Sequence, residues 1–485
     1  MYKRQVDDID DAFAEISSGV GYGYYTATIV MMDTDQKRLE VKAKEVQKVF
    51  TGGFNARLET LNTIEAYLGS LPGHTDQNVR RPLISNVHLS KLVPTAGIWS
   101  GGMTNSCNLY PENSPMLMQC ETKGSTPFRL SLHVGDVGHT LVLGKTGSGK
   151  SVFLQALIAQ SRRYKNSKVF AFDKGYSGYA LCMAAAGKHY DIGSENQAVN
   201  FCPLNDIHEP AERQWAVGWI ETCCRLEGMN KLTPQQRNAV DDGLKDLVES
   251  DTRSLTEFCA AVQDFDVREA MKGYLIDGRF GELLDANSST ISYSDFNVFE
   301  LEHLMSMGNA TLPTLLYIIR QIRRNLGGVP GFIFLDEAWI ALGHEVFSAE
   351  LEELFRVTRK ENIAIVMATQ SPKSVVESDI GDVVIESCMT KILLPNAEAV
   401  NENNREIYSK HLGLNDTQIN LIAGAIPKRQ YYYTSPNGNR LFEMTLGKKT
   451  LALCGVASEA GKRMIDSCID EHGEEKWLER YLENV

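Results

Sequence analysis

Long apolar runs are missing from this 485-residue sequence. No stretch approaches the roughly 18 consecutive apolar residues that a transmembrane helix needs. Near the start, Lys3 and Arg4 are followed by Asp7 and Asp8, where a signal peptide requires an apolar segment. We therefore expect no transmembrane helix, and we expect the chain to stay on the cytoplasmic side.

Positive charge and metal-binding cysteine patterns are scarce as well. The 49 Lys and Arg residues are outnumbered by 62 Asp and Glu residues, which gives a net charge of −13. This balance argues against a surface whose main task is to coat nucleic acid, although it is compatible with a local basic pore. The ten cysteines contain no C-x-x-C pair, so we predict free, mostly buried thiols rather than a zinc site.

The most informative stretch is residues 139–152. Residues 140–143 are apolar and partly β-branched, which predicts a short buried strand. The next eight residues match the P-loop pattern G-x-x-x-x-G-K-[ST], whose glycines let backbone N–H groups surround phosphate oxygens. The residues that we expect to bind the nucleotide are Gly144, Lys145, Thr146, Gly147, Ser148, Gly149, Lys150, Ser151 and Val152.

The chemistry of this motif predicts ATP and Mg²⁺ as ligands. Lys150 can reach the β- and γ-phosphates, and the Ser151 hydroxyl can bind Mg²⁺. The apolar spacing after Ser151 indicates a helix, whose N-terminus favours negative charge. The alternative is a chance glycine turn, which the combination of strand, full motif and helix disfavours. We expect Lys150 to face solvent, so that its replacement by Ala leaves the fold intact.

Two further strands end in polar residues suited to hydrolysis. Residues 331–335 form an apolar run typical of a strand buried on both faces, and Asp336 and Glu337 follow it. We expect Asp336 to hold the Mg²⁺ shell and Glu337 to orient and deprotonate the attacking water. Residues 363–369 predict another buried strand, tipped by Gln370, whose amide can reach the γ-phosphate or the water. Alternatively, Gln370 is a strand-end residue bonded only to backbone.

A third strand, residues 168–173, ends in Asp173 and is followed by Lys174. Ligands of open α/β sheets lie at the carboxyl ends of the strands, which places both residues on the nucleotide side. They either contact the nucleotide or only cap the next helix.

The rest of the chain divides into helical and strand-rich parts. Residues 209–284 show helical character throughout and predict an all-α insertion, which we expect to be removable without unfolding the sheet. Residues 70–115 are rich in turn-forming residues and predict irregular structure. The other predicted strands are 22–32, 50–58, 128–134, 294–301, 383–394, 430–434, 440–446 and 451–456. The other predicted helices are 33–49, 61–68, 312–326, 348–359, 401–414 and 458 to the end.

Several of these segments together resemble the VirB/TrbE-type conjugative-transfer ATPases of type IV secretion systems. The similarity covers about residues 130–457 closely and 1–100 more loosely. It is carried by the P-loop strand and by residues 169–175, 334–338, 368–371, 412–418 and 427–433. Because members of that family are usually much longer at the N-terminus, the chain resembles their C-terminal ATPase portion, encoded by a split gene or present as a fragment.

The resemblance implies an α/β fold, namely a RecA-like P-loop NTPase with an additional strand and a parallel central sheet. It implies an N-terminal α+β remnant with a linker over residues 1–115. The ATPase domain would span 116–485, with the all-α insertion at about 205–290 and C-terminal helices at 458–485. It also implies a hexameric ring at the cytoplasmic face of the bacterial inner membrane, working with other secretion components in pilus assembly and substrate transfer.

Two other functions stay open at this stage. The first is a DNA-pumping motor like the coupling proteins; contact with DNA fits that function but not the acidic net charge. The second is a scaffold protein that binds nucleotide only to assemble, which the presence of Lys150, Asp336 and Glu337 argues against.

No arginine lies in the P-loop or beside the two acids, so we expect a neighbouring subunit to supply one. Arg359, between a predicted helix and the Gln370 strand, is the first candidate, and Arg429 is the second. The alternative for both is a surface ion pair.

Overall fold

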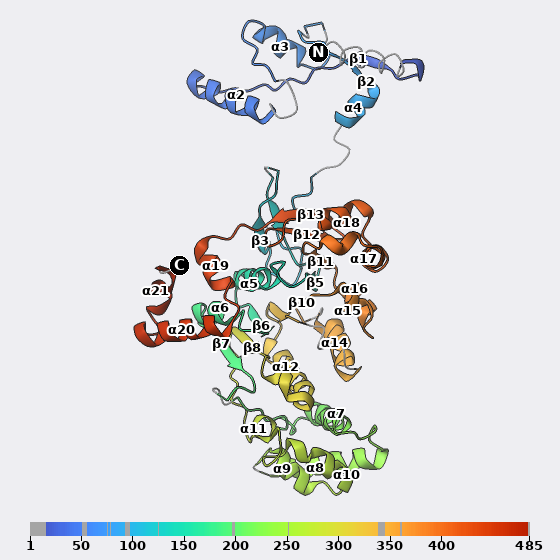
Figure 1. Ribbon diagram of the computed structural model, residues 1–485, viewed down its shortest axis with the longest axis vertical. Coiled ribbons are helices and arrows are strands. Elements are labelled where there is room, and N and C mark those ends of the chain that lie inside the picture. The colour runs from blue at the N-terminus through green and yellow to red at the C-terminus, as the bar shows by residue number, and fades with distance from the viewer. Residues whose placement is uncertain are drawn as a thin grey trace. The chain divides into compact units, whose positions relative to one another are not determined.

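A computed structural model of the chain describes residues 16–50, 56–74, 76–77, 79–92, 98–124, 126–195, 199–250, 252–337, 345–358 and 361–483. The chain forms two compact units, Met1–Ile98 and Trp99–Val485 (Figure 1). Within these described ranges, no helix is long and apolar enough to cross a membrane.

A nine-stranded sheet is the centre of the second unit, with the order β13-β12-β11-β5-β10-β9-β6-β8-β7. The strands from β11 to β7 are parallel to one another, as the sequence predicts. The hairpin of β12 and β13 adds an antiparallel edge, so the sheet is mixed. The strands are β5 (Thr140–Leu143), β6 (Lys168–Asp173), β7 (Lys188–Asp191), β8 (Phe296–Glu300), β9 (Gly331–Leu335), β10 (Ile363–Thr369), β11 (Thr390–Leu393), β12 (Gln430–Ser435) and β13 (Gly438–Glu443).

Strand β10 lies between the P-loop strand β5 and strand β9, and it is therefore the expected additional strand. The registers pair Thr369 with Leu143 and Met367 with Leu335. Because parallel strands end at the same edge of a sheet, the P-loop, Asp336 and Gln370 follow neighbouring strand ends.

The side chains of these strands alternate between two apolar cores, one on each face of the sheet. In β9, Ile333 faces one core, and Phe332 and Phe334 face the other. Complete burial on both faces explains why the strand sequences are continuous apolar runs. The first core also contains α12 (Thr311–Leu326) and α14 (Glu345–Thr358), and the second contains α5 (Lys150–Ser161).

The expected all-α insertion separates β7 from β8, and within the described part of this segment no strand is present. Its helices lie together at the lower end of the view in Figure 1. They are α7 (Pro210–Leu226), α8 (Pro234–Val248), α9 (Leu255–Ala261), α10 (Phe265–Met271), η1 (Lys272–Tyr274) and α11 (Gly281–Leu284).

The insertion shares its apolar core with the sheet. Trp219 of α7 is 2% exposed, and its indole N–H donates to the Pro313 carbonyl of α12 at 2.9 Å. Arg320 of α12 binds the Glu212 carboxylate at 2.5 Å. The expectation that residues 209–284 can be removed without unfolding the sheet stays a prediction, and the shared core argues against it because α7 covers an apolar face of α12.

Short helices and turns complete the second unit. The strand predicted at 383–394 is only partly correct, because α16 occupies its first half. The described residues of the predicted 128–134 strand form only β4, which pairs with a strand that the sequence did not predict, β3. These elements are β3 (Met118–Cys120), β4 (Phe128–Leu130), α6 (Tyr179–Ala184), η2 (Leu304–Ala310), α15 (Pro372–Val376), α16 (Gly381–Ser387), η3 (Ala397–Val400), α17 (Glu402–Glu406), η4 (Ile407–His411) and α18 (Asp416–Ala423).

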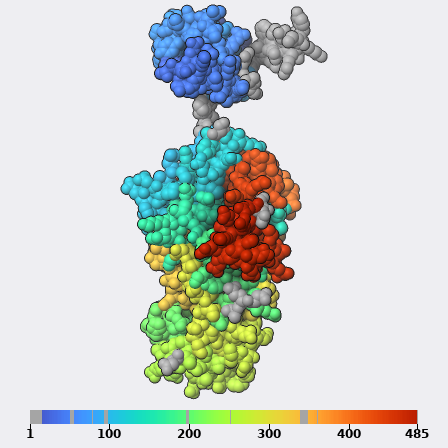
Figure 2. All heavy atoms as spheres, turned by 90° about the vertical axis from the view of Figure 1, so that its left-hand side faces the viewer, coloured from blue at the N-terminus to red at the C-terminus, as the bar shows by residue number. Residues whose placement is uncertain are grey.

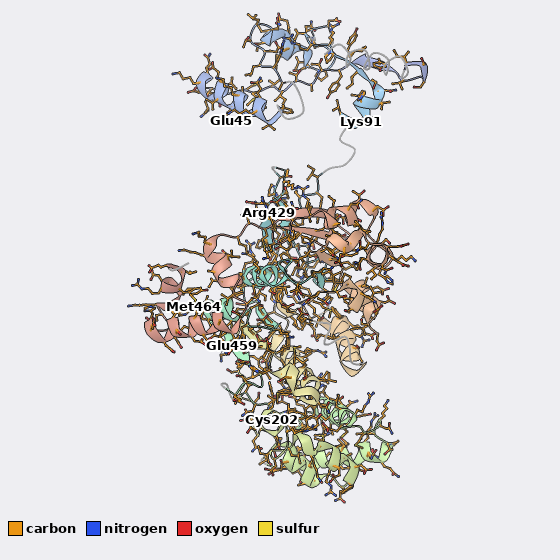
Figure 3. All side chains as sticks on the ribbon, in the orientation of Figure 1. Glu45, Lys91, Cys202, Arg429, Glu459 and Met464 are labelled. Carbon is orange, nitrogen blue, oxygen red and sulfur yellow. The ribbon has the colours of Figure 1, made fainter. Side chains whose placement is uncertain are left out.

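The C-terminal residues form three helices, α19 (Lys448–Cys454), α20 (Glu459–His472) and α21 (Trp477–Glu483). The strand predicted at 451–456 is wrong, because a short apolar run fits a helix or a strand equally well. Ser458 caps α20 as expected. These C-terminal residues, which are red in Figure 2, pack on α6 through a small apolar cluster. Glu459 and Met464, which are labelled in Figure 3, belong to α20.

The first unit contains β1 (Tyr22–Tyr24), α2 (Gln36–Phe50), α3 (Thr63–Gly69), β2 (Leu83–Ser85) and α4 (Asn86–Leu92). The strand predicted at 22–32 is therefore only three residues long. Of the strand predicted at 50–58, residues 51–55 lie outside the described ranges and 56–58 form no strand. Ser85 is the only buried residue among those described in this unit, so its helices enclose no core. The two units divide after Ile98, which falls within the span of residues 1–115 predicted to hold the N-terminal domain and its linker.

We predict that Trp219→Ala lowers the free energy of unfolding of the second unit by about 3–5 kcal/mol, the usual cost of truncating a buried tryptophan. Phe265→Ala in the same insertion is the control, because Phe265 is 65% exposed and we expect a change within about 0.5 kcal/mol. Thermal and denaturant unfolding measure both. Equal, small shifts would show that the insertion is independent of the sheet.

Candidate nucleotide-binding site

Glycine is required at three positions of the P-loop. Gly147 and Gly149 have φ angles of 80° and 101°, which are unfavourable for residues with a side chain. A Cβ on Gly144 would lie 2.8 Å from the Cβ of Leu394. The loop is held at both ends, because Gly144 N–H donates to Thr369 and Lys428 N–H donates to Ser148.

Helix α5 begins directly after the loop, with Lys150 as its first residue. Its first backbone N–H groups have no carbonyl partner within the helix, and they carry the positive end of its dipole. The loop and α5 together therefore form an anion-binding site of the kind that the motif predicts.

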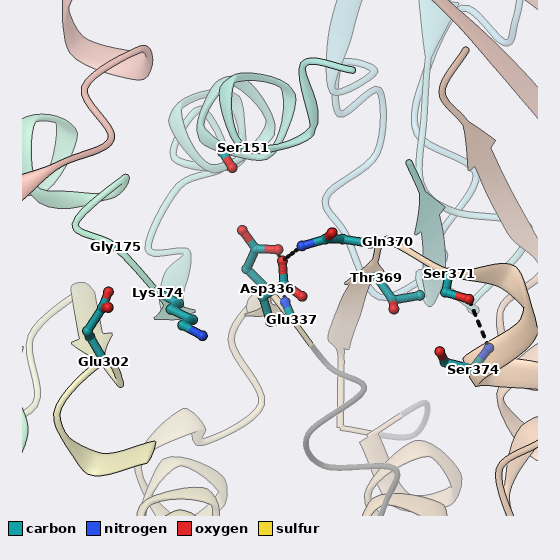
Figure 4. A pocket seen from close by; sticks show the side chains of 10 residues that line it. All are labelled: Ser151, Lys174, Gly175, Glu302, Asp336, Glu337, Thr369, Gln370, Ser371 and Ser374. Atoms are coloured by element: carbon teal, nitrogen blue, oxygen red, sulfur yellow. Dashed lines mark hydrogen bonds between the residues drawn. The ribbon is translucent and has the colours of Figure 1, made fainter. Parts of the chain in front are cut away.

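A cavity of about 460 Å³ lies beside this helix N-terminus (Figure 4). It brings together Ser151, Asp336, Glu337 and Gln370, which the sequence selected separately. The complete lining is Ser151, Lys174, Gly175, Glu302, Asp336, Glu337, Thr369, Gln370, Ser371 and Ser374.

Lys150 is buried between the two acids. Its ammonium lies 2.7 Å from Asp336 Oδ1 and 2.9 Å from Glu337 Oε1, and the residue is only 7% exposed. The expectation that Lys150 faces solvent is therefore wrong. The strand order places the end of β9 opposite the start of α5, so the carboxylates occupy the space into which the lysine extends.

Glu337 and Gln370 are connected to the P-loop by hydrogen bonds. The Gln370 amide donates to Glu337 Oε1 at 2.5 Å, and its oxygen accepts from the Thr146 hydroxyl. Gln370 is thus bonded to side chains, and the alternative of purely backbone contacts does not hold. Glu337 has a φ of 56°, a left-handed conformation that costs a residue with a side chain about 1–2 kcal/mol.

Asp173 and Lys174 have different surroundings. Asp173 is buried and accepts hydrogen bonds from the Ser177 hydroxyl and the Gly178 N–H, both at 2.6 Å. It therefore holds the turn that precedes α6 and does not line the cavity, and burial raises its pKa. Lys174 lines the cavity.

The sequence analysis missed several residues of this site. Glu300 is the last residue of strand β8, which pairs with β6, and Glu302, two residues further on, reaches the cavity. Ser371 and Ser374, just after Gln370, line it as well. Polar residues within a few positions after a buried strand were the signal that could have found Glu302, Ser371 and Ser374.

Of the two candidate arginines, the structure describes only Arg429, which is not among the residues that line the cavity. Arg359 lies outside the described residues, so its role stays a prediction. Arg429, labelled in Figure 3, is 61% exposed and pairs with Glu443 at 2.8 Å, as expected for a surface ion pair.

A P-loop, two acids after a neighbouring strand and an inserted strand between them define a P-loop NTPase. Models of known families agree with this class. The TraG P-loop domain matches residues 244–432, and the FtsK/SpoIIIE family matches residues 103–163. The family described as CagE, TrbE, VirB, a component of the type IV transporter system, matches residues 2–80.

Similar proteins identify the family. The chain is 45% identical to a probable TrbE conjugal transfer protein of Sinorhizobium fredii, over 99% of this chain and 73% of that protein. It is 44% identical to the conjugal transfer protein TrbE of Rhizobium radiobacter, over 98% of this chain and 59% of that protein. The chain belongs to the TrbE/VirB4 family of type IV secretion ATPases, and it spans only a portion of the length of these relatives.

The fold agrees with a solved structure of that family. VirB4 of Thermoanaerobacter pseudethanolicus superposes with a TM-score of 0.56 at 15% identity, covering 70% of this chain and 99% of that one. The expected P-loop NTPase fold is thus confirmed. The matches of the FtsK/SpoIIIE family, which covers the P-loop, and of the TraG P-loop domain agree with an ATPase.

We predict that Lys150→Met destabilises the second unit by about 1–3 kcal/mol, because it leaves two poorly solvated carboxylates without their cation. Lys145→Met is the control, since Lys145 pairs with Glu398 at the surface, where such pairs contribute about 0–1 kcal/mol. Thermal unfolding compares the two variants. Equal melting temperatures would show that the ion pairs of Lys150 add nothing to stability.

Proposed function

We propose that this chain hydrolyses Mg·ATP and that the energy released drives pilus assembly and substrate transfer in a type IV secretion system. The observation that supports this most directly is the contact of Lys150 with both Asp336 and Glu337, joined to Gln370. The P-loop cation, two acids and an amide thus meet at one edge of the sheet.

Each residue has a proposed role in hydrolysis. Lys150 neutralises charge on the transferred phosphate, and the hydroxyl of Ser151 and the carboxylate of Asp336 hold Mg²⁺. Glu337 orients and deprotonates the attacking water, and Gln370 senses the γ-phosphate. A metal ion held by these two residues would supply positive charge that neutralises the negative charge developing on the phosphate oxygens.

The ion pairs of Lys150 connect binding to activation. Phosphate oxygens can pair with the Lys150 ammonium only if they replace the two carboxylates that now contact it. The same exchange would free Asp336 for the metal and Glu337 for the water. We infer that the catalytic groups are released when the phosphates bind.

Partners and location are proposals of the same kind. We propose a hexameric ring at the cytoplasmic face of the inner membrane, working with other secretion components. This rests on the family, whose VirB4 members are named type IV secretion system proteins. A DNA-pumping activity would instead appear as salt-sensitive stimulation of hydrolysis by DNA.

The direct test is phosphate release by the purified chain. We expect ATP hydrolysis that requires Mg²⁺ and that Lys150→Ala abolishes, provided that the variant is shown to be folded. A chain that binds nucleotide without turnover under all conditions, including the presence of membrane partners, would instead be a scaffold.

Substitutions of Glu337 and Asp336 should have different effects on turnover and nucleotide binding. Glu337→Gln keeps shape but cannot take a proton, so we expect a fall in turnover of about 10²–10⁴-fold. Its nucleotide affinity should equal or exceed that of the wild type, because Lys150 loses one charged partner. Asp336→Asn should weaken binding only when Mg²⁺ is present. Titration of a fluorescent ATP analogue with Mg²⁺ or EDTA measures both, and identical behaviour of the two variants would refute these roles.

We also predict that Arg359 completes the site of a neighbouring subunit. An arginine supplied in this way typically contributes about 10³–10⁵-fold in rate. Arg359→Ala and Lys150→Ala should each be inactive alone, and mixing them should restore some activity where an intact P-loop meets an intact Arg359. An active Arg359→Ala ring would contradict this, as would no recovery in rings that exchange subunits.

A further inference from the structure

Lys174 occupies a special place in the cavity. Strand β6 lies beside β9 in parallel register, with Phe172 opposite Leu335, and Asp336 N–H donates to the Phe172 carbonyl at 3.1 Å. Lys174 therefore emerges one strand away from Glu337. In Figure 4 its side chain lies between Glu302 on one side and Asp336 and Glu337 on the other.

This lysine differs from Lys150 in having no carboxylate partner in the part of the chain that the structure describes. Lys150 contacts two carboxylates, whereas no ion pair joins the Lys174 ammonium to any described residue. The portion of the cavity wall that the structure describes contains no arginine either. Lys174 is thus the cation on this wall that is free to meet an added negative charge.

The loop that carries Lys174 is held by a buried carboxylate. Glu300 is fully buried and accepts hydrogen bonds from the N–H groups of Gly175 at 3.1 Å, Tyr176 at 2.7 Å and Glu302 at 3.0 Å. Burial and the nearby carboxylate of Asp173 raise the pKa of Glu300.

The backbone of this loop is unusual as well. Gly175 and Tyr176 have φ angles of 86° and 60°, so two successive residues are left-handed. A non-glycine residue rarely adopts that conformation unless the surroundings hold it there. Asp173 binds the other end of the loop through Ser177 and Gly178. The backbone from which Lys174 projects is therefore held without a bound ligand.

We propose that Lys174 is a further catalytic residue of the ATPase, contacting the γ-phosphate from the β6 side while Lys150 approaches from the P-loop. Glu300 is the positioning residue that holds its loop. This rests on the proposed ATP hydrolysis at the same cavity. Lys174 would neutralise charge that grows on the phosphate oxygens as the bond to the leaving group breaks.

The test replaces Lys174 with Met, which keeps length without charge, and with Arg, which keeps charge. Lys174→Met should lower kcat by about 10²-fold, the usual effect of losing one such stabilising group. It should weaken binding of a non-hydrolysable ATP analogue about tenfold, a change of roughly 1.4 kcal/mol, and leave ADP affinity unchanged. Lys174→Arg should restore most of both. Lys373→Met, at an exposed ion pair near the cavity, is the matched control and should behave as the wild type.

A second arm tests Glu300. Glu300→Gln should reduce kcat and the preference for the ATP analogue over ADP, and the double variant with Lys174→Met should be no worse than Lys174→Met alone. If Glu300→Gln does not fold, Gly175→Ala disturbs the same loop, since space exists for its Cβ but its φ of 86° is unfavourable. Additive losses would overturn the positioning role.

The outcomes separate this inference from the proposed function. An active wild type with an unaffected Lys174→Met variant overturns the inference alone. A wild type without ATPase activity overturns the proposed function, and the ratio of analogue to ADP affinity then still decides whether Lys174 contacts the γ-phosphate. Equal weakening of ADP and analogue by Lys174→Met would show a general structural effect and refute the inference.

Discussion

The contact of Lys150 with Asp336 and Glu337 depends on almost every other feature of the second unit. It requires β9 to end opposite the start of α5, and β10 to lie between β9 and the P-loop strand. Charges at 2.7 and 2.9 Å that are largely shielded from water attract strongly, but each has lost hydration. These ion pairs are therefore suited to a change of partner, in which a phosphate would replace the carboxylates at Lys150 and a metal ion would replace Lys150 at Asp336.

Rigidity around that contact comes from the sheet. Its strands are packed on both faces, and alternate side chains enter two separate cores. A sheet held in this way fixes the positions of its strand ends closely, which suits a site assembled from residues that follow five of them. The all-α insertion extends one of these cores through Trp219. Helices of the insertion therefore pack in the same apolar core as the strands that build the cavity.

Buried acids shape the cavity wall from behind. Asp173 and Glu300 are almost inaccessible, and both use loop N–H groups to compensate for lost hydration. Asp173 and Glu300 thereby hold the backbone of residues 175–178. Lys174, next to this segment, lines the cavity together with the acids Glu302 and Glu337. The first unit differs completely, because its described helices bury no apolar residue and contain no comparable constraint.

Local sequence patterns were enough to predict the P-loop, the two acids, the Gln370 strand, the additional strand and the helical insertion. Motif spacing and apolar runs are local properties of the sequence, so they can be recognised without knowledge of the tertiary contacts. Such patterns could not decide between helix and strand at 448–454, where a short apolar run fits both. Contacts across the fold placed Lys150 between two carboxylates from a distant strand end. They also brought Glu300 within hydrogen-bond distance of the loop after Lys174, and they left Lys174 without an ion pair among the described residues. Burial and ion pairing arise from contacts between distant segments, and no local pattern in a single sequence records which segments will meet.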